Sequence, residues 1–288
     1  MTPPTRDQLQ LIVQRALDED IAPAGPSDDG LTAGDVTTLC TISADATTSG
    51  DFIAKANGII AGLDVVRLTF GLIDKSVQVD FSIHDGDAVT KGQVFGTVSG
   101  PTRSLLSAER TALNFLQRMS GIATATQRFM DAVKPYRAMI LDTRKTVPGL
   151  RLLDKWAVAL GGGMNHRIGL FDMVLIKNNH ITAVGSITAA INRVRECDDQ
   201  HRPIEVEVRS LAELHEALAL QPDRIMVDNM SLDQMREAVQ NTAGRVPLEA
   251  SGNVTLETVN AIAATGVDFI SSGALTHSVK ALDISLTL

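Results

Sequence analysis

Short, almost wholly apolar runs alternate with amphipathic stretches through the second half of the chain. The runs have the length of buried strands, and the stretches between them repeat their apolar residues with helical spacing. The runs are 139–142 (MILD), 173–176 (MVLI), 204–208 (IEVEV), 224–228 (RIMVD), 247–251 (PLEAS) and 268–272 (DFISS), and the helical stretches are 187–197, 211–220 and 232–241. Apolar strands that alternate with helices are typical of a parallel sheet covered by helices. We therefore predict an α/β fold, namely an α/β barrel of fewer than eight strands that is either open or closed. A flat doubly wound sheet is the alternative.

The first hundred residues follow a different pattern. Residues 6–17 have helical spacing, and a loop rich in Asp, Gly and Pro follows over 18–35. Between 50 and 100, short alternating runs are separated by Gly and Asp, which predicts strands and turns. One helix is expected within them, near 62–73.

A long helical stretch over 104–133 separates the two patterns, and we expect a break in it at Ser120 and Gly121. The change of pattern predicts two domains. They are an N-terminal α+β sandwich over 1–113, joined by the tail 279–288, and a catalytic α/β barrel over 114–278.

Composition excludes several classes of protein. The chain has 288 residues, 44% of them hydrophobic and 21% charged, which is ordinary for a globular protein. No apolar run reaches the roughly 18–20 residues that span a bilayer, and the start of the chain turns acidic without a signal-peptide core. We expect a cytoplasmic protein that does not bind membranes. Cys40 and Cys197 are isolated in the sequence, so we expect them to be buried and to have no redox or zinc-binding role.

Charge is distributed unevenly along the chain. The net charge is −8, yet residues 137–177 contain seven Lys and Arg against three Asp. A protein that binds nucleic acid usually spreads basic residues over a surface, and it often stacks aromatic residues on bases. Aromatic residues make up only 3% of this chain. The local surplus therefore favours a pocket for a small, multiply charged anion, and no nucleic acid is expected.

Polar residues follow each predicted strand. In α/β barrels the C-terminal ends of the strands form the active face, and the last two loops often bind a phosphate. The last two loops here are Ser251-Gly252-Asn253 and Ser272-Gly273-Ala274. Glycine lets the backbone approach an oxyanion, and the N–H groups and Ser hydroxyls donate to it. His277 follows the second loop and either contacts the ligand or caps a helix. The glycines at 161–163 indicate a hinge or a close approach of the backbone.

Carboxylates and cations are expected to meet at the same face. Glu207 and Asp228 end neighbouring strands, and Glu205 shares a face with Glu207 because strand side chains alternate. They form either an oxygen site for Mg²⁺ or structural ion pairs. Five groups are candidates for holding carboxylates or phosphates, namely Arg144, Lys145, His166, Arg167 and Lys177. Lys145 or Lys177 could instead form a Schiff base, which would make the protein a lyase or an aldolase.

Motifs at these positions resemble the quinolinate phosphoribosyltransferases, also called nicotinate-nucleotide pyrophosphorylases (carboxylating). They occur in the family's order over nearly the whole chain. The motifs are SAERTALNFLQRMSGIAT (107–124), DTRKT (142–146), GGGMNHR (161–167), LIKNNH (175–180), EVEV (205–208), DN (228–229), EASGN (249–253) and SSGALTH (271–277). Residues 23–33 are somewhat long for the corresponding loop. A molybdate-associated relative shares the fold, so a non-catalytic anion-binding protein is a further alternative.

The resemblance implies a reaction and a set of partners. Such an enzyme transfers phosphoribosyl from phosphoribosyl pyrophosphate to quinolinate with decarboxylation. The products are nicotinate mononucleotide, pyrophosphate and CO₂, and the reaction belongs to de novo NAD biosynthesis. Mg²⁺ is the implied cofactor. The implied assembly is a homodimer or a hexamer built of dimers, in which Arg110 reaches the neighbouring subunit's site.

The resemblance also implies residue roles. The quinolinate carboxylates would be held by Arg144, His166, Arg167 and Lys177, and Thr143 in the DTRKT motif would also contact substrate. Lys145 would lie between the two substrates. Glu207 and Asp228 would face the ribose hydroxyls and Mg²⁺, directly or through water. With Lys145 they are the expected catalytic residues. The 5-phosphate would lie on residues 251–253 and 272–274, with His277 beside them.

Overall fold

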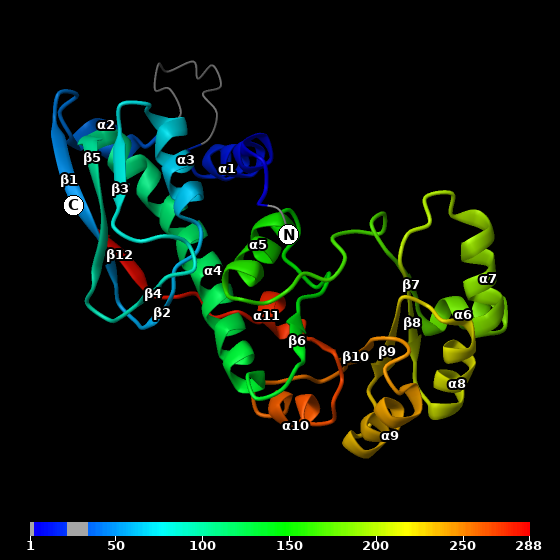
Figure 1. Cartoon of the computed structure of the whole chain (residues 1–288). Helices are drawn as coiled ribbons and strands as arrows, with labels where there is room; N and C mark the ends of the chain where they lie inside the picture. Colours follow the sequence, from blue (N-terminus) through cyan, green and yellow to red (C-terminus); the bar gives the residue numbers. More distant parts are fainter. Residues whose placement is uncertain (1–2, 22–33) are drawn as a thin grey trace. The chain divides into compact units, whose positions relative to one another are not determined.

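A computed structural model describes residues 3–21 and 34–288, so residues 23–33 lie outside the described residues. The chain divides into two compact units, coloured along the sequence in Figure 1. The first unit comprises 1–125, 148–162 and 279–288, and the second comprises 126–147 and 163–278. The predicted domain boundary at 113–114 falls inside a long helix, α4 (Thr102–Val133).

The first unit contains an antiparallel sheet of four strands in the order β12-β1-β5-β3. Its last strand is the C-terminal tail, which pairs with β1 from Asp51 opposite Thr287 to Ala54 opposite Ile284. The same unit contains a separate two-stranded antiparallel sheet, formed by β2 and β4. The strands are β1 (Thr47–Ala54), β2 (Gly58–Ile59), β3 (Gln78–Phe81), β4 (Ala88–Val89), β5 (Val94–Pro101) and β12 (Ile284–Thr287).

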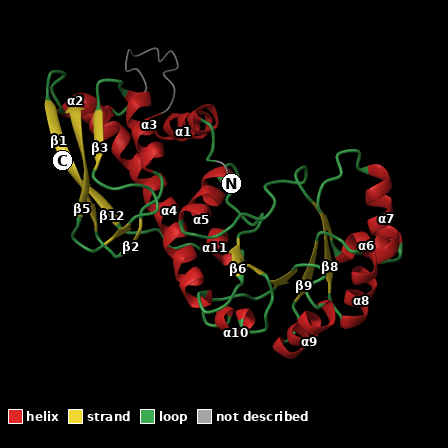
Figure 2. Cartoon of the chain, viewed as in Figure 1, coloured by secondary structure: helices red, strands yellow, loops and turns green. Residues whose placement is uncertain are grey.

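Helices of the first unit pack against this sheet, as Figure 2 shows for α3 and α4. The apolar faces of the strands and helices meet in one core, in which Phe52 and Phe95 from the sheet and Phe70 from α3 are fully buried. Phe52 and Phe70 meet edge to face, with ring centroids 6.5 Å apart. The helices are α1 (Arg6–Ile21), α2 (Val36–Thr41), α3 (Leu63–Ile73), the first part of α4, and α5 (Arg151–Leu160).

The expected break in α4 at Ser120 and Gly121 is wrong, because the helix is continuous. Both residues serve tertiary contacts. Ser120 is fully buried, and its Oγ accepts a hydrogen bond from the N–H of Ala61 at 3.0 Å. A Cβ on Gly121 would lie 2.9 Å from Cα of Ala281 in the returning tail. Small residues are needed here to let the tail approach the helix, so they do not mark a helix end.

The second unit is built on a parallel sheet of six strands in the order β6-β11-β10-β9-β8-β7. Five consecutive strands, β7 to β11, are neighbours in chain order, and β6 lies beyond β11. This order has no reversal and excludes the doubly wound alternative. No ladder joins β6 to β7 within the described residues, so the α/β barrel is open. The strands are β6 (Met139–Leu141), β7 (Val174–Ile176), β8 (Ile204–Val208), β9 (Arg224–Asp228), β10 (Leu248–Ser251) and β11 (Phe269–Ser271).

Serine side chains start three of the helices that connect these strands. Ser186, Ser210 and Ser231 each precede a helix, and each Oγ accepts a backbone N–H of the first turn. The predicted helices are confirmed as α7 (Ile187–Cys197), α8 (Leu211–Leu220) and α9 (Leu232–Thr242). The shorter ones are α6 (Asn178–Val184), α10 (Val259–Ala263) and α11 (Ala274–His277).

The sequence also predicted that no segment spans a membrane and that both cysteines are buried. Among the described residues, no helix is both long and apolar enough to cross a membrane, and the cytoplasmic location stays a prediction. The expected burial of Cys40 and Cys197 is wrong, because both are exposed free thiols. Cys197 is the last residue of α7, whose buried residues, Ile187, Ala190 and Ile191, all lie in the first half of the helix.

Candidate functional site

A cavity of about 200 Å³ lies at the C-terminal ends of the strands of the second unit. Polar residues at strand ends meet there because parallel strands finish at one edge of the sheet. Nine predicted site residues line it: Thr143, Arg144, Lys145, His166, Arg167, Lys177, Glu207, Asp228 and Ser251. The remaining lining residues are Leu175, Met226, Glu249 and Ser271.

Seven predicted residues do not line this cavity. Arg110 is exposed on α4 and belongs to the first unit. The other six belong to the two Ser-Gly loops and the short helix after them: Gly252, Asn253, Ser272, Gly273, Ala274 and His277.

Arg144 and Arg167 bring two positive charges to one wall of the cavity. The Nη1 of Arg167 donates to the carbonyl of Met173 at 3.1 Å. Burial and then the charge of Arg144 lower the pKa of Arg167 from its usual value. Nε of Arg144 is buried and has no hydrogen-bond partner within the described part of the chain. Two guanidinium groups with unused donors form a receptor for a carboxylate or phosphate.

Two aspartates hold the loop that carries His166 and Arg167. Asp142, fully buried at the end of β6, accepts the N–H of His166 at 2.9 Å. Asp172 accepts the N–H groups of Ile168 and Gly169 at 2.7 and 2.8 Å. The backbone of this loop is therefore fixed at both ends by carboxylates.

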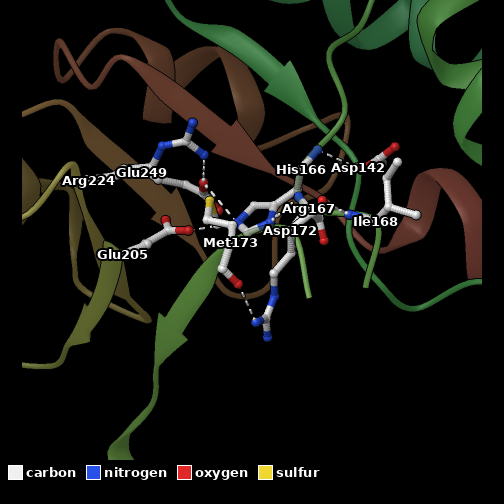
Figure 3. A network of polar contacts seen from close by, with 9 residues as sticks. All are labelled: Asp142, His166, Arg167, Ile168, Asp172, Met173, Glu205, Arg224 and Glu249. Carbon is white, nitrogen blue, oxygen red and sulfur yellow. Dashed lines mark hydrogen bonds and ion pairs between the residues drawn. The ribbon is translucent and has the colours of Figure 1, made fainter. Parts of the chain in front are cut away.

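His166 turns both of its ring nitrogens into the protein (Figure 3). Its Nδ1 accepts the N–H of Arg167 at 2.8 Å. Its Nε2 lies 2.8 Å from Oε2 of Glu205 and 3.5 Å from Oε2 of Glu249. Because Nδ1 is an acceptor, the ring hydrogen is on Nε2 and faces the two carboxyl groups. The implied contact of this imidazole with a substrate carboxylate therefore has no free ring nitrogen to make it.

Glu205 and Glu249 are both fully buried, on β8 and β10. Burial raises the pKa of Glu205, and the charge of Arg224 partly opposes the rise. Burial and the neighbouring Glu205 raise the pKa of Glu249 to about 7. Burial therefore favours the neutral form of both carboxyl groups. Nη1 of Arg224 donates to Oε2 of Glu249 at 2.9 Å, so the buried charges balance.

His166, Glu205 and Glu249 offer ligand atoms that all lie within 4.8 Å of one another, a spacing that a metal ion could use. The guanidinium of Arg224, however, already pairs with Glu249 and would repel a cation at this position. We therefore interpret the cluster as a proton-sharing network.

Glu207 and Asp228 face each other across β8 and β9, as predicted from strand alternation. Glu207 lies opposite Met226 in the ladder, so Asp228 follows two residues along the same face. Arg209 bridges them, with Nη2 3.3 Å from Glu207 Oε1 and Nε 3.7 Å from Asp228 Oδ2. Arg209 was not among the residues predicted from the sequence, although its position two residues after Glu207 was a usable signal.

The first Ser-Gly loop has a backbone that requires glycine. Gly252 has φ +102°, and a Cβ there would lie 2.6 Å from Cγ of Asn229. Asn229 Oδ1 in turn accepts Nδ2 of Asn253 at 3.3 Å, and the N–H of Asn229 donates to the carbonyl of Ser251 at 2.9 Å. This loop is therefore tied to the end of β9.

The second Ser-Gly loop lies beside Lys145. Thr276 Oγ1 donates to the carbonyl of Lys145 at 2.8 Å, and a Cβ on Gly273 would meet Lys145 Cδ at 2.8 Å and His277 Cδ2 at 2.9 Å. Ser272 is buried, and its Oγ donates to the carbonyl of Val254 at 3.2 Å. The hydroxyl of Ser272 thus joins the two loops together.

Sequence reasoning missed Glu249, Arg224 and Asp142 as parts of this site. Each was visible as a charged residue within or beside an apolar run, a place where burial demands a partner. The sequence could not identify the partners, because they come from different strands.

Comparisons with known proteins match both parts of the chain. Two family models match: the N-terminal domain of quinolinate phosphoribosyl transferase over residues 35–120, and its C-terminal domain over 122–287. The chain is 50% identical to quinolinate phosphoribosyltransferase [decarboxylating] 1b of Nicotiana tabacum, with 99% of this chain and 83% of the relative covered.

Solved structures with the same fold span the whole chain. NadC from Streptococcus pyogenes superposes with a TM-score of 0.93 at 40% identity, covering 100% of this chain and 98% of the other. The nicotinate-nucleotide pyrophosphorylase from Francisella tularensis gives a TM-score of 0.91 at 40% identity, covering 98% and 96%.

Proposed function

The chain belongs to the quinolinate phosphoribosyltransferase family, and from this premise we propose that the cavity of the second unit is where it joins quinolinate to a phosphoribosyl group. The reaction consumes phosphoribosyl pyrophosphate and quinolinate and yields nicotinate mononucleotide, pyrophosphate and CO₂. One observation carries the assignment of the site. Two guanidinium groups, Arg144 and Arg167, line the same small cavity as two carboxylates, Glu207 and Asp228.

The acceptor, a pyridine dicarboxylate, fits the cationic wall. Arg144 has a buried Nε that makes no hydrogen bond to any of the described residues, and Arg167 and Lys177 line the same cavity. Binding a dianion would satisfy these donors and relieve the repulsion that lowers the pKa of Arg167. We assign the carboxylate contacts to these three residues. His166 is assigned a different role, because its ring nitrogens face the protein interior.

The donor, phosphoribosyl pyrophosphate, fits the part of the cavity that Glu207 and Asp228 line. Glu207 and Asp228 are partly exposed, at 11% and 18% of their side chains. Breakage of the bond to pyrophosphate leaves positive charge on the ribose ring, which nearby carboxylates stabilise. Lys145, between the cavity and the second Ser-Gly loop, is well placed to bind phosphate oxygens. The N–H groups of the two Ser-Gly loops are the proposed 5-phosphate site.

Mg²⁺ fits the same pair of carboxylates. Carboxylate oxygens are hard donors of the kind Mg²⁺ prefers, and two of them leave room for phosphate oxygens or water. When bound, the ion would neutralise charge on the departing pyrophosphate. Arg209 already places positive charge between Glu207 and Asp228, so the ion would bind there in competition with this side chain.

Decarboxylation needs no further group from the protein. Once the ring nitrogen carries ribose it is a pyridinium, which stabilises the electron pair left on the ring carbon as CO₂ departs, and a proton from water then bonds to that carbon. Arg144, Arg167 and Lys177 hold the ring in place while this happens. Their main contribution is to position two anions and to replace the water around them.

A second copy of the chain would complete the site. The loop that carries Arg167 exposes Leu170 and Phe171 at 72% and 67%, an unusual position for large apolar side chains. Burial of this loop by a neighbouring subunit, which also brings Arg110, is the assembly we propose. Light scattering should show a dimer or a larger assembly, and the double variant Leu170→Ser/Phe171→Ser should dissociate it. A wild-type monomer would refute this part.

The reaction itself is tested by incubating the protein with quinolinate, phosphoribosyl pyrophosphate and Mg²⁺ and following nicotinate mononucleotide by mass spectrometry. Product should require all three components and should disappear when nicotinate replaces quinolinate. Product from nicotinate alone would overturn the choice of acceptor. Borohydride should trap no adduct on Lys145 or Lys177, because this route has no Schiff base.

A further inference from the structure

We propose that Glu205 and Glu249 are positioning residues of the acceptor pocket, which hold His166 so that its ring fixes the main chain of Arg167. The inference rests on the proposed function, since it assumes that Arg167 binds quinolinate. None of the motifs assigns a role to either glutamate.

The orientation of the His166 imidazole is set by the groups that lie next to its two nitrogens. Its two nitrogens lie on opposite sides of the ring, and each has its own partner (Figure 3). Nδ1 accepts from the N–H of Arg167, and Nε2 faces Glu205 at 2.8 Å. A rotation of the ring by 180° would replace Nδ1 by a carbon, and the N–H of Arg167 would lose its acceptor. The glutamates disfavour that rotation because it would place a carbon instead of Nε2 beside two buried carboxyl groups, whose oxygens lie 2.8 and 3.5 Å from this nitrogen.

The orientation of His166 affects the cavity through the main chain of Arg167. The N–H of Arg167 is bound to the ring, and the N–H of His166 is bound to Asp142 at 2.9 Å. Two successive backbone groups are therefore fixed. The guanidinium of Arg167 starts from this fixed backbone and lines the cavity. A loss of the imidazole orientation would loosen the point from which Arg167 reaches the substrate.

The position of Glu249 depends in turn on Arg224. Arg224 donates to Glu249 at 2.9 Å, and its guanidinium lies 4.3 Å from the centre of the Phe269 ring. This cation–π contact keeps the guanidinium of Arg224 next to the Phe269 ring. Arg224 thus holds Glu249 in place, and Glu249 and Glu205 both lie next to the ring of His166. Charged groups on three neighbouring strands, β8, β9 and β10, act through one imidazole.

The test compares two replacements of Glu205. Glu205→Gln keeps a polar side chain of the same shape beside Nε2, whereas Glu205→Leu replaces it with an apolar one of similar volume. We expect Glu205→Leu to raise the KM for quinolinate about tenfold, with the KM for phosphoribosyl pyrophosphate unchanged, and Glu205→Gln to stay near wild type. The matched control is Asp223→Asn. Asp223 also contacts β8, accepting the N–H of Ile204 at the opposite end of the strand.

A spectroscopic readout separates positioning from general destabilisation. In protein labelled with ¹⁵N-histidine, His166 should show a protonated Nε2 and an unprotonated Nδ1, and its signals are identified by their loss in His166→Gln. Glu205→Leu should alter these signals, and Asp223→Asn should not. The opposite tautomer in the wild type would overturn the proposal, as would equal rises of both KM values in Glu205→Leu.

Binding of quinolinate to the protein without donor, measured by calorimetry, distinguishes the two levels of the argument. A wild-type protein that does not bind quinolinate refutes the proposed site, whatever the histidine signals show. A wild type that binds, together with a Glu205→Leu variant that binds equally well, refutes the positioning role alone.

Discussion

Nη2 of Arg209 lies 3.3 Å from Oε1 of Glu207, at the edge of the cavity where a divalent cation is expected. The same guanidinium reaches Asp228 at 3.7 Å. Half of the Arg209 side chain is exposed, at 51%, so this is a weak and exchangeable ion pair. Arg209 therefore competes with Mg²⁺ for the two carboxylates.

Replacement of Arg209 by alanine should strengthen binding of a divalent cation to the protein without substrate. The expected gain is up to about fivefold, corresponding to ~1 kcal/mol for a solvent-screened pair. Mn²⁺ titration followed by electron paramagnetic resonance measures it directly. Arg236→Ala is the matched control, since Arg236 makes an exposed ion pair with Asp233 on α9. Unchanged or weaker Mn²⁺ binding in Arg209→Ala would contradict the competition.

Removal of a cation from the acceptor pocket should weaken quinolinate binding selectively. Arg144→Ala should raise the KM for quinolinate by the equivalent of ~1.5–3 kcal/mol, the strength of a hydrogen bond to a charged group. Arg110→Ala should do the same if the neighbouring subunit completes the site. Steady-state kinetics with each substrate varied in turn provides the measurement. Normal quinolinate kinetics in both variants would refute the assignment of the pocket.

Glu249 should make the stability of the protein depend on pH. Its folded pKa, about 7, lies above the unfolded value of 4.5. The folded state thus binds more protons between these values, and the stabilisation is lost as pH rises through 7. Glu249→Gln cannot ionise and should lose less stability than wild type between pH 5 and 8. The difference is expected to be on the order of 1 kcal/mol in urea unfolding. Parallel stability–pH curves for the two proteins would show that Glu249 ionises normally.

Gly121→Ala tests why a glycine stands inside α4. Helix propensity alone predicts that alanine stabilises a helix interior by ~1 kcal/mol. The added Cβ would instead meet the tail, 2.9 Å from Cα of Ala281. We therefore expect a lower melting temperature. Gly71→Ala in α3, where no atom of the described residues lies within 4 Å of the added carbon, is the control. A higher melting temperature for Gly121→Ala would show that the tail can move aside.

The sequence by itself determined the fold class and the family. Apolar runs such as 204–208 and 224–228 became β8 and β9 because strand and helix periodicity are local properties of the chain. Residues at strand ends, such as Arg144 and Glu207, were expected to meet because parallel strands finish at one edge of a sheet, and they do line one cavity. Their roles in binding and catalysis stay predictions.

The tertiary structure alone decided which residues are partners. His166, Glu205 and Glu249 come from a loop and two different strands, and no local pattern states that they lie within 4.8 Å of one another. The sequence suggested that Glu205 faces a metal or a cation and that His166 contacts substrate. The fold turns both inward, because a buried carboxyl group is stable only beside polar or charged groups, and Nε2 of His166 lies 2.8 Å from Glu205. The unbroken α4 has a similar cause: the space that Gly121 leaves is filled by a tail about 160 residues further along the chain.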